Sequence, residues 1–319
     1  MLDRYSVLDG RIAHSDAGSI PVDVYVRPDG EERAYLTDEL GIDPHTLASS
    51  IDPDETPRIE FEDEYIAIIL KYPKNYSADD NFLFRVKSMG IFLFAERVVL
   101  VVDEDFPLLF TGKFATRVYT RQDVLLRVLT QTIRHFESHL RVINMCSDEI
   151  ETQLNESNDS SSLLDMFTLE KGLVYYVNAL SGNRRAFERI RAGAYKFQFT
   201  EENIELLDDL QIENRQFLDQ AQVYSQVLSG LMDARASIIN NNLNVLMKNM
   251  NAIVIAVAIP TFFTIPTFFT GVFGMSEFTR FFCGDVEGKY WYISFPVFFI
   301  LMTALAFFVF WLIKKFEKH

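Results

Sequence analysis

Asp, Asn and Met side chains recur at helical spacing just before the first long apolar segment of the chain. Asp233, Asn240 and Met247 are seven residues apart, and Asn244 and Asn251 add steps of four and three to the same helix face. Mg²⁺ gives up its waters reluctantly, so a ring of amide oxygens can hold the hydrated ion. A ring of Asp233 would concentrate cations, and Met247 would form an apolar constriction. The pattern predicts a pore-lining helix face; an asparagine-rich interfacial helix without a pore is the alternative.

Two long uncharged segments follow this face. One runs from Ala252 to Phe273 over 22 residues, and the other from Tyr290 to Ile313 over 24 residues. Each can cross about 30 Å of hydrocarbon as a helix. Basic residues flank the pair on its outer ends, which predicts a multi-pass protein of the cell (inner) membrane with both termini in the cytoplasm. The flanking residues are Lys248, Lys314, Lys315 and Lys318.

The part of the chain before these segments is strongly acidic. The 319 residues carry a formal net charge of -15, and the first 248 hold 25 Lys and Arg against 41 Asp and Glu, a net of -16. The N-terminus lacks the basic and apolar regions of a signal peptide. Cys146 and Cys283 fall on opposite sides of the membrane in this topology, so they cannot pair within one chain. We expect no nucleic-acid partner and no organic cofactor.

The sequence contains no motif of the common enzyme classes. It has no Walker loop, dinucleotide fingerprint or nucleophile elbow. His135 and His139 are four residues apart on a predicted helix, but the adjacent glutamate of a zinc-protease motif is absent. We interpret both as surface histidines and predict that the protein is not an enzyme.

Short apolar runs broken by turn residues fill the first hundred positions, which predicts an α/β domain. One helix is expected from Glu31 to Ser50, followed by a turn at Asp52 to Pro57. The expected strands are Pro21 to Val26, Arg58 to Phe61, Tyr65 to Tyr72, Phe84 to Lys87, Gly90 to Phe94 and Val98 to Val102.

Helical spacing begins near Arg121. Proline is absent from Val118 to Ile259, so very long helices are permitted. Breaks are expected at Asn155 to Ser162 and at Phe197 to Thr200, and no stop signal follows before the membrane. The last of these helices should therefore continue into the first apolar segment. The alternating charges along the helices are interpreted as a solvated coiled-coil face.

The first apolar segment ends in the sequence TGVFGMSE, residues 270–277. This sequence resembles the end of the first membrane helix in the CorA family of magnesium and cobalt transporters, where an aromatic-Gly-Met-Asn motif follows a stretch rich in Pro and Thr. The resemblance extends through residues 242–248 and 230–233, and more faintly to 57–60 and 90–93, so that it covers nearly the whole chain. It implies a funnel-shaped homopentamer whose pore is lined by the first span of each subunit.

The resemblance also implies roles for individual residues. The transported and regulatory ion would be Mg²⁺ or another divalent cation such as Co²⁺ or Ni²⁺. Asp209, with Asp208 beside it, falls at the position of a regulatory metal carboxylate between subunits. Asp103, Glu104 and Asp105 of a neighbouring subunit are candidates for the other half by composition alone, and ordinary surface acids are the alternative. The selectivity loop would contain Gly274, Met275, Ser276 and Glu277.

Two features depart from the family pattern. Ser276 stands where the family has asparagine, which permits a zinc transporter of the same superfamily or a non-conducting membrane-anchored scaffold as alternatives. The hexapeptide from Pro260 to Ile265 is almost repeated from Pro266 to Gly271, and deleting one copy restores the expected family spacing. Six residues turn a helix by about 600°, which is about 240° beyond a full turn. We therefore expect a kink or an unwound turn between the two prolines.

The expected fold class is an α+β (α/β) N-terminal cytoplasmic domain, long coiled-coil-like helices and two C-terminal transmembrane helices. The boundaries place the α/β domain at 1–118, a helical hairpin at 119–199 and a stalk helix at 200–251. The first transmembrane helix takes 252–274, the outer loop 275–289, the second transmembrane helix 290–313 and a cytoplasmic tail 314–319.

Overall fold

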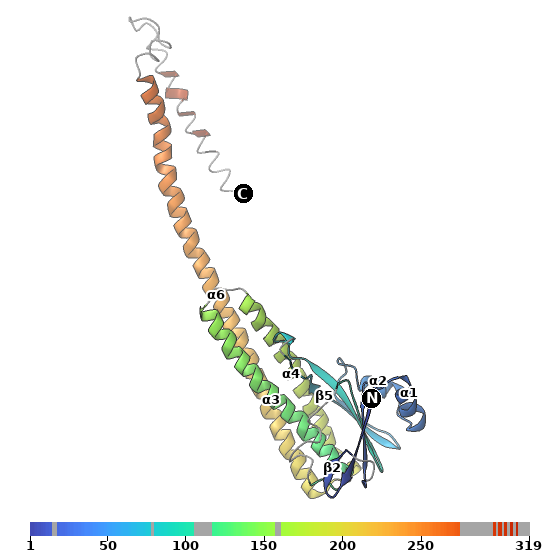
Figure 1. Cartoon of the computed structure of the whole chain (residues 1–319). Helices are drawn as coiled ribbons and strands as arrows, with labels where there is room; N and C mark the ends of the chain where they lie inside the picture. The colour runs from blue at the N-terminus through green and yellow to red at the C-terminus, as the bar shows by residue number, and fades with distance from the viewer. Residues whose placement is uncertain are drawn as a thin grey trace, which may run out of the picture. The chain divides into compact units, whose positions relative to one another are not determined.

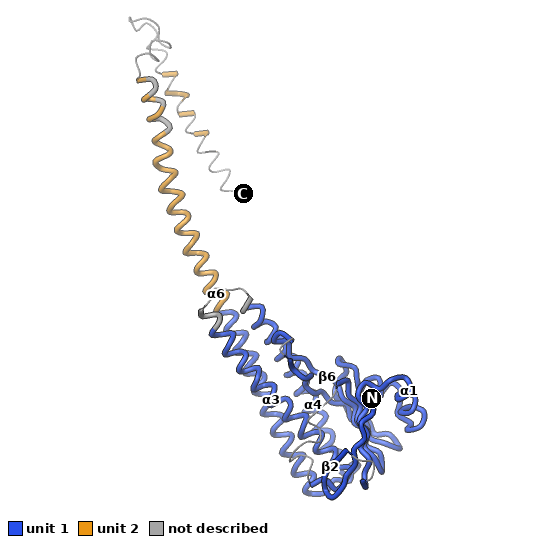
Figure 2. Tube along the Cα trace, viewed as in Figure 1, with its two compact units in different colours: residues 1–234 blue, residues 235–319 orange. Residues whose placement is uncertain are grey.

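The computed structural model describes residues 1–14, 18–77, 80–104, 117–156 and 161–274, with scattered positions between 296 and 311 (Figure 1). These scattered positions are helical and belong to the second apolar segment. The expected outer loop and cytoplasmic tail lie outside the described residues. The chain divides into two compact units, Met1–Ala234 and Arg235–His319 (Figure 2).

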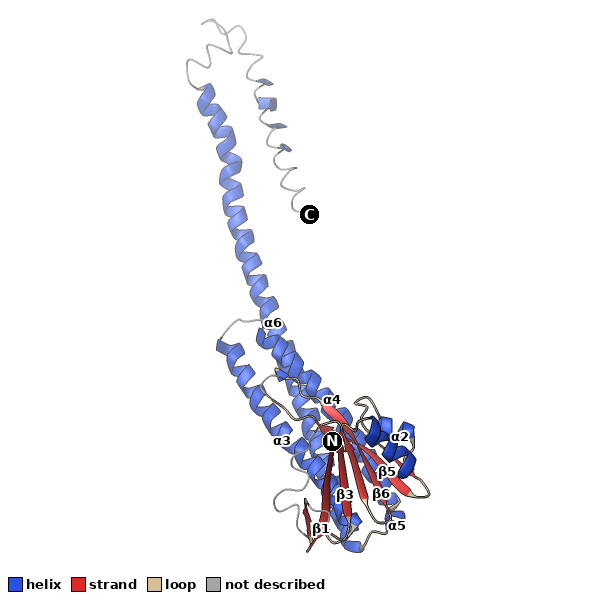
Figure 3. Ribbon diagram, turned by 45° about the vertical axis from the view of Figure 1, so that its right-hand side comes forward, coloured by secondary structure: helices blue, strands red, loops and turns tan. Residues whose placement is uncertain are grey.

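Unit 1 contains a seven-stranded sheet with the strand order β2-β1-β3-β7-β6-β5-β4 (Figure 3). The β3 and β7 strands are parallel, and all other neighbouring strands of the sheet are antiparallel. The strands are β1 (Leu2–Leu8), β2 (Arg11–Ala13), β3 (Pro21–Val26), β4 (Arg58–Phe61), β5 (Tyr65–Pro73), β6 (Val86–Phe94) and β7 (Val98–Val102).

Helices cover both faces of this sheet (Figures 1 and 3). The short helical elements between Gly30 and Ser49 lie on one face, and the long helices α3 and α4 pack on the other. Successive side chains of a strand point to opposite faces of the sheet, and here both faces are covered. A central strand can therefore be apolar at every residue, which explains the unbroken VVLVV sequence of β7. The helical elements are α1 (Gly30–Ala34), the π-helix η1 (Tyr35–Glu39), α2 (Pro44–Ser49), α3 (Arg121–Glu156), α4 (Ser161–Ala192), α5 (Ala194–Phe197) and α6 (Glu201–Phe273).

The single helix expected from Glu31 to Ser50 is wrong, because the chain forms α1, η1 and α2 there. Gly41 adopts a φ of 68°, which interrupts the helical backbone. Asp43 then caps α2 by accepting a hydrogen bond from the Thr46 backbone N–H at 2.9 Å, and Pro44 takes the first helical turn. The Asp-Pro pair is a helix-start signal within the predicted range.

The β-strand predictions are confirmed for β3, β4 and β7, and extended by one residue for β5. The runs expected at Phe84 to Lys87 and Gly90 to Phe94 are joined in the single strand β6, which begins at Val86, so Phe84 and Arg85 lie before it. Its polar residues have partners inside the protein: Lys87 pairs with Asp103, and Ser88 accepts a hydrogen bond from the Lys71 ammonium at 2.9 Å. The prediction also missed β1 and β2, where charged residues interrupt the apolar pattern.

The α/β domain and the helical hairpin are not the separate domains that we expected, because they share one core. Apolar residues of β5, β6 and β7 pack with those of α3, α4 and the start of α6. Asn183 of α4 also binds the backbone of β5: it accepts from the Lys71 N–H at 2.9 Å and donates to the Lys71 carbonyl at 2.8 Å. A second core is made mainly by the three long helices and includes Phe136, Tyr176 and Leu218.

The long helix α6 begins where the sequence predicted. Thr200 and Asn203 cap its start reciprocally, since each backbone N–H donates to the other side chain at 3.2 Å. Glu201 and Glu202 occupy the first turn, where the helix dipole favours acids. The expected continuation into the first apolar segment is confirmed, because α6 runs without interruption to Phe273.

Candidate ion-conduction site

The predicted pore residues lie on one unbroken helix. Because α6 keeps about 100° per residue, Asp233, Asn240 and Asn251 fall within a narrow sector of its surface. All five candidates are exposed in the single chain, and the Met247 side chain is 57% exposed. The helix therefore offers a stripe of polar and thioether groups that no part of its own described chain covers.

The apolar side chains around this stripe are equally exposed. Ile253, Val254 and Ile255 follow one another, so they point in directions about 100° apart, and their exposed fractions are 64%, 58% and 58%. In the described residues one helical stretch, Glu201–Thr264, has a window with mean hydropathy 1.6 that can cross a membrane, and none of that window is buried. Apolar exposure on all sides is typical of a helix surrounded by lipid and by other helices.

Helix α6 stays helical through both prolines of the duplicated segment (Figure 1), so the expected unwound turn is not found there. Proline fits a helical φ, but in a helix interior it removes one N–H donor and its ring crowds the carbonyl four residues earlier, so the expected kink stays a prediction. The threonine hydroxyls of the segment all donate to carbonyls of the same helix, so none needs water in an apolar surrounding. The pairs are Thr261 to Val257 at 2.8 Å, Thr264 to Pro260 at 2.7 Å, Thr267 to Phe263 at 2.7 Å and Thr270 to Thr267 at 2.9 Å.

Because the helix is uninterrupted, its C-terminal end points in a different direction around the helix axis from the polar stripe. Gly274 continues the hydrogen-bonding pattern, because its N–H donates to the Thr270 carbonyl at 2.9 Å. It lies 23 residues after Asn251, which places it about 140° around a straight helix from the polar stripe. The other predicted selectivity residues, Met275, Ser276 and Glu277, lie outside the described residues.

The acids predicted to bind regulatory metal have different surroundings. Asp208 is held by Arg191, whose Nε and Nη2 donate to the two carboxylate oxygens at 2.7 and 3.3 Å. Asp209, one residue later, is exposed. Within the described ranges, no group of three or more His, Cys, Asp or Glu side chains is arranged to hold a metal ion. A single chain thus presents Asp209 as an exposed carboxylate and Asp208 already neutralised by a guanidinium.

The candidates for the other half of such a site are also engaged. Asp103 pairs with Lys87, and Arg27 Nε lies 3.2 Å from its Oδ1. Glu104 accepts from the Asn75 N–H at 2.7 Å, and burial raises the pKa of its carboxyl group. Asp105 lies outside the described residues. These contacts stabilise the end of β7, and their interaction with a neighbouring subunit stays a prediction.

The interpretation of His135 and His139 as surface residues is wrong. Both are buried on the inner side of α3, and the His139 Nδ1 lies 2.7 Å from the Tyr176 hydroxyl oxygen. Burial lowers the pKa of His135 to about 4 and, with the charge of His135, lowers that of His139 to about 3. Their position among Val128, Phe136 and Leu140 at helical spacing was the signal that could have placed them inside.

The geometry described so far is a long exposed helix with a polar stripe that leads into an apolar span. The family model of the CorA-like Mg2+ transporter protein matches residues 23–315. The chain belongs to this family. Members of the CorA-like family are membrane transporters of divalent cations, and this activity is distinct from enzymatic catalysis.

Individual CorA relatives agree with this assignment. The cobalt/magnesium transport protein CorA of Methanocaldococcus jannaschii is 26% identical over 275 residues, which cover 83% of this chain and 82% of the relative. The complete structure of the CorA magnesium transporter from that organism has a TM-score of 0.67 at 19% identity and covers 97% of each chain. The ZntB cytoplasmic domain from Vibrio parahaemolyticus has a TM-score of 0.56 at 10% identity and covers 75% of this chain and 98% of that domain. The two solved structures show that the chain shares their fold.

Proposed function

We propose that five copies of the chain form a channel that conducts hydrated divalent cations, most readily Mg²⁺, across the cell (inner) membrane. The observation that carries this proposal is the exposed stripe of Asp233, Asn240, Asn244, Met247 and Asn251, which leads directly into the candidate membrane span of α6. Polar side chains near the hydrocarbon are costly unless they face water or each other. A central axis shared by five copies supplies such a water-filled path.

Each position of the stripe has a task in this channel. Five Asp233 carboxylates would raise the local concentration of cations at the cytoplasmic mouth. The amide oxygens of Asn244 and Asn251 would accept hydrogen bonds from the waters around Mg²⁺, so that the ion passes with part of its hydration shell. Met247 would narrow the path with an apolar ring, which can close by losing its water.

The outer mouth would be formed by Gly274, Met275, Ser276 and Glu277, which follow the first membrane span. The second span would then return the chain to the cytoplasm, so that both termini lie there. A serine hydroxyl is shorter than an asparagine amide and reaches less far toward a hydrated ion. This substitution favours a second candidate, a Zn²⁺ transporter, because it alters the ring that would otherwise suit Mg²⁺. Co²⁺ and Ni²⁺ are further candidate ions.

Cytoplasmic metal would regulate the channel by binding between Asp209 and acids of a neighbouring subunit. A metal at Asp208 would have to displace the Arg191 guanidinium, so Asp209 is the more accessible of the two. A dication there would also relieve repulsion within the acidic cytoplasmic part of the chain.

Ion flux into liposomes that contain the purified full-length protein tests the conduction path. We expect Mg²⁺ flux that falls at least about tenfold in Asn244→Leu and Asn251→Leu, because each removes a ring of water-binding amides. Asn242→Leu is the matched control, since Asn242 lies on the same helix about 180° from Asp233. Equal flux in all three variants would contradict the stripe as a pore.

The same liposomes distinguish the alternatives. A panel of Mg²⁺, Co²⁺, Ni²⁺ and Zn²⁺ ranks the ions, and the Zn²⁺ transporter is favoured if Zn²⁺ flux exceeds Mg²⁺ flux and Ser276→Asn reverses the order. No flux of any of the four ions from a pentamer identified by native mass spectrometry would favour the non-conducting scaffold. A monomer or dimer as the sole species would exclude the fivefold pore.

A further inference from the structure

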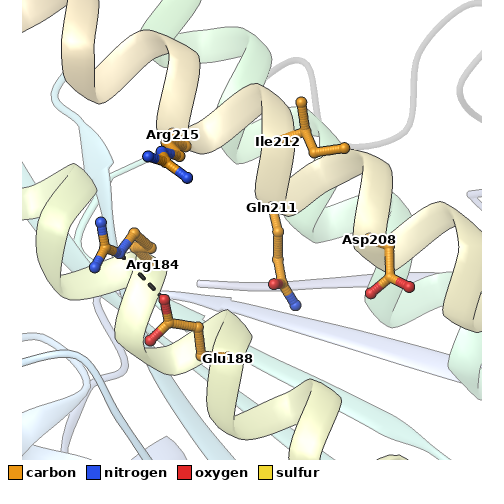
Figure 4. A pocket seen from close by; sticks show the side chains of 6 residues that line it. All are labelled: Arg184, Glu188, Asp208, Gln211, Ile212 and Arg215. Carbon is orange, nitrogen blue, oxygen red and sulfur yellow. Dashed lines mark ion pairs between the residues drawn. The ribbon is translucent and has the colours of Figure 1, made fainter.

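A pocket of about 440 Å³ opens between α4 and α6 within unit 1 (Figure 4). This volume lies in the range of sites that bind small molecules. The pocket is lined by Arg184 and Glu188 of α4 and by Asp208, Gln211, Ile212 and Arg215 of α6.

The charges of this pocket are unequally neutralised. Glu188 has Arg184 as its partner at 3.2 Å, and Asp208 has Arg191, so both acids are engaged. Arg215 forms no ion pair with an acid in the part of the chain that the structure describes. The guanidinium groups of Arg184 and Arg215 lie at the same end of the pocket (Figure 4). Two cations therefore share one end of the cavity with a single carboxylate.

An anionic ligand satisfies this arrangement better than a cation does. The planar guanidinium presents parallel N–H donors that match the oxygens of phosphate. A divalent cation would meet two guanidinium groups at the positive end and two carboxylates that already have partners.

The remaining lining residues give the pocket room and contacts beyond one phosphate group. The Gln211 side chain extends toward the cavity from α6, where its Nε2 donates to the Phe187 carbonyl at 3.3 Å and fixes the amide (Figure 4). The Ile212 side chain is 66% exposed and offers an apolar surface at the rim. We propose that the pocket binds the phosphate groups of a soluble, nucleotide-sized metabolite, with Arg184 and Arg215 as the anion-binding residues.

This inference concerns unit 1 and does not depend on ion conduction. Binding to the full-length protein in detergent can be measured by calorimetry with three probes: inorganic phosphate, ATP and the Mg²⁺ complex of ATP. We expect ATP to bind more tightly than inorganic phosphate, because it also fills the volume beside Gln211 and Ile212. The Mg²⁺ complex should bind more weakly than free ATP, since the metal neutralises charge that the arginines would meet.

Two variants and one control test the residues. Arg215→Gln and Arg184→Gln should each weaken ATP binding by about tenfold or more, because each removes a charge-assisted contact. Arg185→Gln should change it less than about twofold, because Arg185 is exposed on the same helix and donates to Ser181 at 3.2 Å, outside the pocket. Circular dichroism of the variants checks that α4 and α6 still form.

Several outcomes would overturn the inference. If none of the three probes at 10 mM gives a heat of binding, and none displaces another, no such ligand binds. Equal losses in the pocket variants and in Arg185→Gln would show nonspecific attraction between ATP and surface arginines. Dissociation of the oligomer in Arg215→Gln, without phosphate binding in the wild type, would show that the pocket receives an acidic side chain of a second copy instead.

Discussion

Helix α6 has two parts that use the same backbone in different surroundings. In unit 1 it buries a seam of Leu207, Leu210, Leu218, Ala221 and Leu228 against other helices. From Arg235 to Thr264 none of the described side chains is buried. The first part is therefore positioned by its own chain. In the proposed channel, lipid and other copies would surround the second part, which carries Asn240, Asn244, Met247 and Asn251 of the conduction path.

The largest expected effect is acid unfolding of unit 1, with the exposed part of α6 still helical. His135 and His139 have lowered pKa values in the folded state, so below about pH 6.5 the unfolded state binds protons that the folded state excludes. Stability should fall as the pH drops from about 6.5 to 4, by an amount on the order of 5 kcal/mol for the two histidines. Denaturant unfolding followed by hydrogen exchange across this pH range measures it.

The control for this effect is the double variant His135→Gln and His139→Gln. It removes the two groups that titrate, so the fall in stability between pH 6.5 and 4 should shrink even if the variant is less stable at pH 7. An unchanged pH dependence would assign acid sensitivity to the carboxylates of unit 1 instead.

A large-to-small substitution should destabilise unit 1 when it lies in the core, and leave it unchanged when it lies in the exposed part of α6. Phe187→Ala empties a fully buried site between the sheet and the helices and should cost about 4 kcal/mol of unfolding free energy. Phe263→Ala is the matched variant, because its ring is 64% exposed in the single chain. It should leave the urea midpoint of unit 1 unchanged in detergent. Comparable shifts in both would mean that the two units unfold as one.

The hydrogen bonds between Asn183 and the Lys71 backbone predict a smaller loss. Asn183→Ala leaves a buried N–H and a buried carbonyl of β5 without their partner, which should cost about 2 kcal/mol. Faster hydrogen exchange at Lys71 than at Leu100 in the neighbouring core would place the loss at this contact. An unaltered exchange rate at Lys71 would indicate that another group replaces the amide.

The smallest effect is expected for the ion pair between Arg191 and Asp208. The two side chains are 42% and 47% exposed, so a double-mutant cycle with Arg191→Ala and Asp208→Ala should give less than about 1 kcal/mol. The variant Arg191→Ala should at the same time increase stabilisation by millimolar Mg²⁺, since Asp208 loses its competing cation. A melting temperature that responds to Mg²⁺ equally with and without Arg191 would exclude this competition.

Side-chain patterns within one element were sufficient to predict the elements whose faces are uniformly apolar or polar. The VVLVV strand and the register of Asp233, Asn240 and Asn251 both follow from side-chain periodicity. The prediction divided strand β6 at Ser88 and Met89, because the polar pair Lys87 and Ser88 ends an apolar run unless their partners Asp103 and Lys71 are known. Those partners are distant in the sequence, and periodicity carries no information about them.

The candidate site shows the same limit. The contact of Asp208 with Arg191 depends on how α4 turns through α5 into α6, which no residue spacing on α6 alone could indicate. The burial of His135 and His139 was accessible from the sequence, because they share a face with the apolar residues of α3. The positive end of the pocket also comes from two helices, so it was interpreted as part of a solvated charged face.

In α6, the number of copies of the hexapeptide determines how far the end of the helix is rotated relative to its start. One extra copy advances the end of the helix by about 9 Å and turns it by about 240°, two extra copies by about 120°, and three by about 0°, since eighteen residues make five complete turns. A gain or loss of one repeat by replication slippage would thus rotate the end of α6 relative to the polar stripe in a single genetic event, without changing any side chain of the stripe. The number of repeats therefore fixes the angle between the two ends of the helix, and it is inherited with the gene.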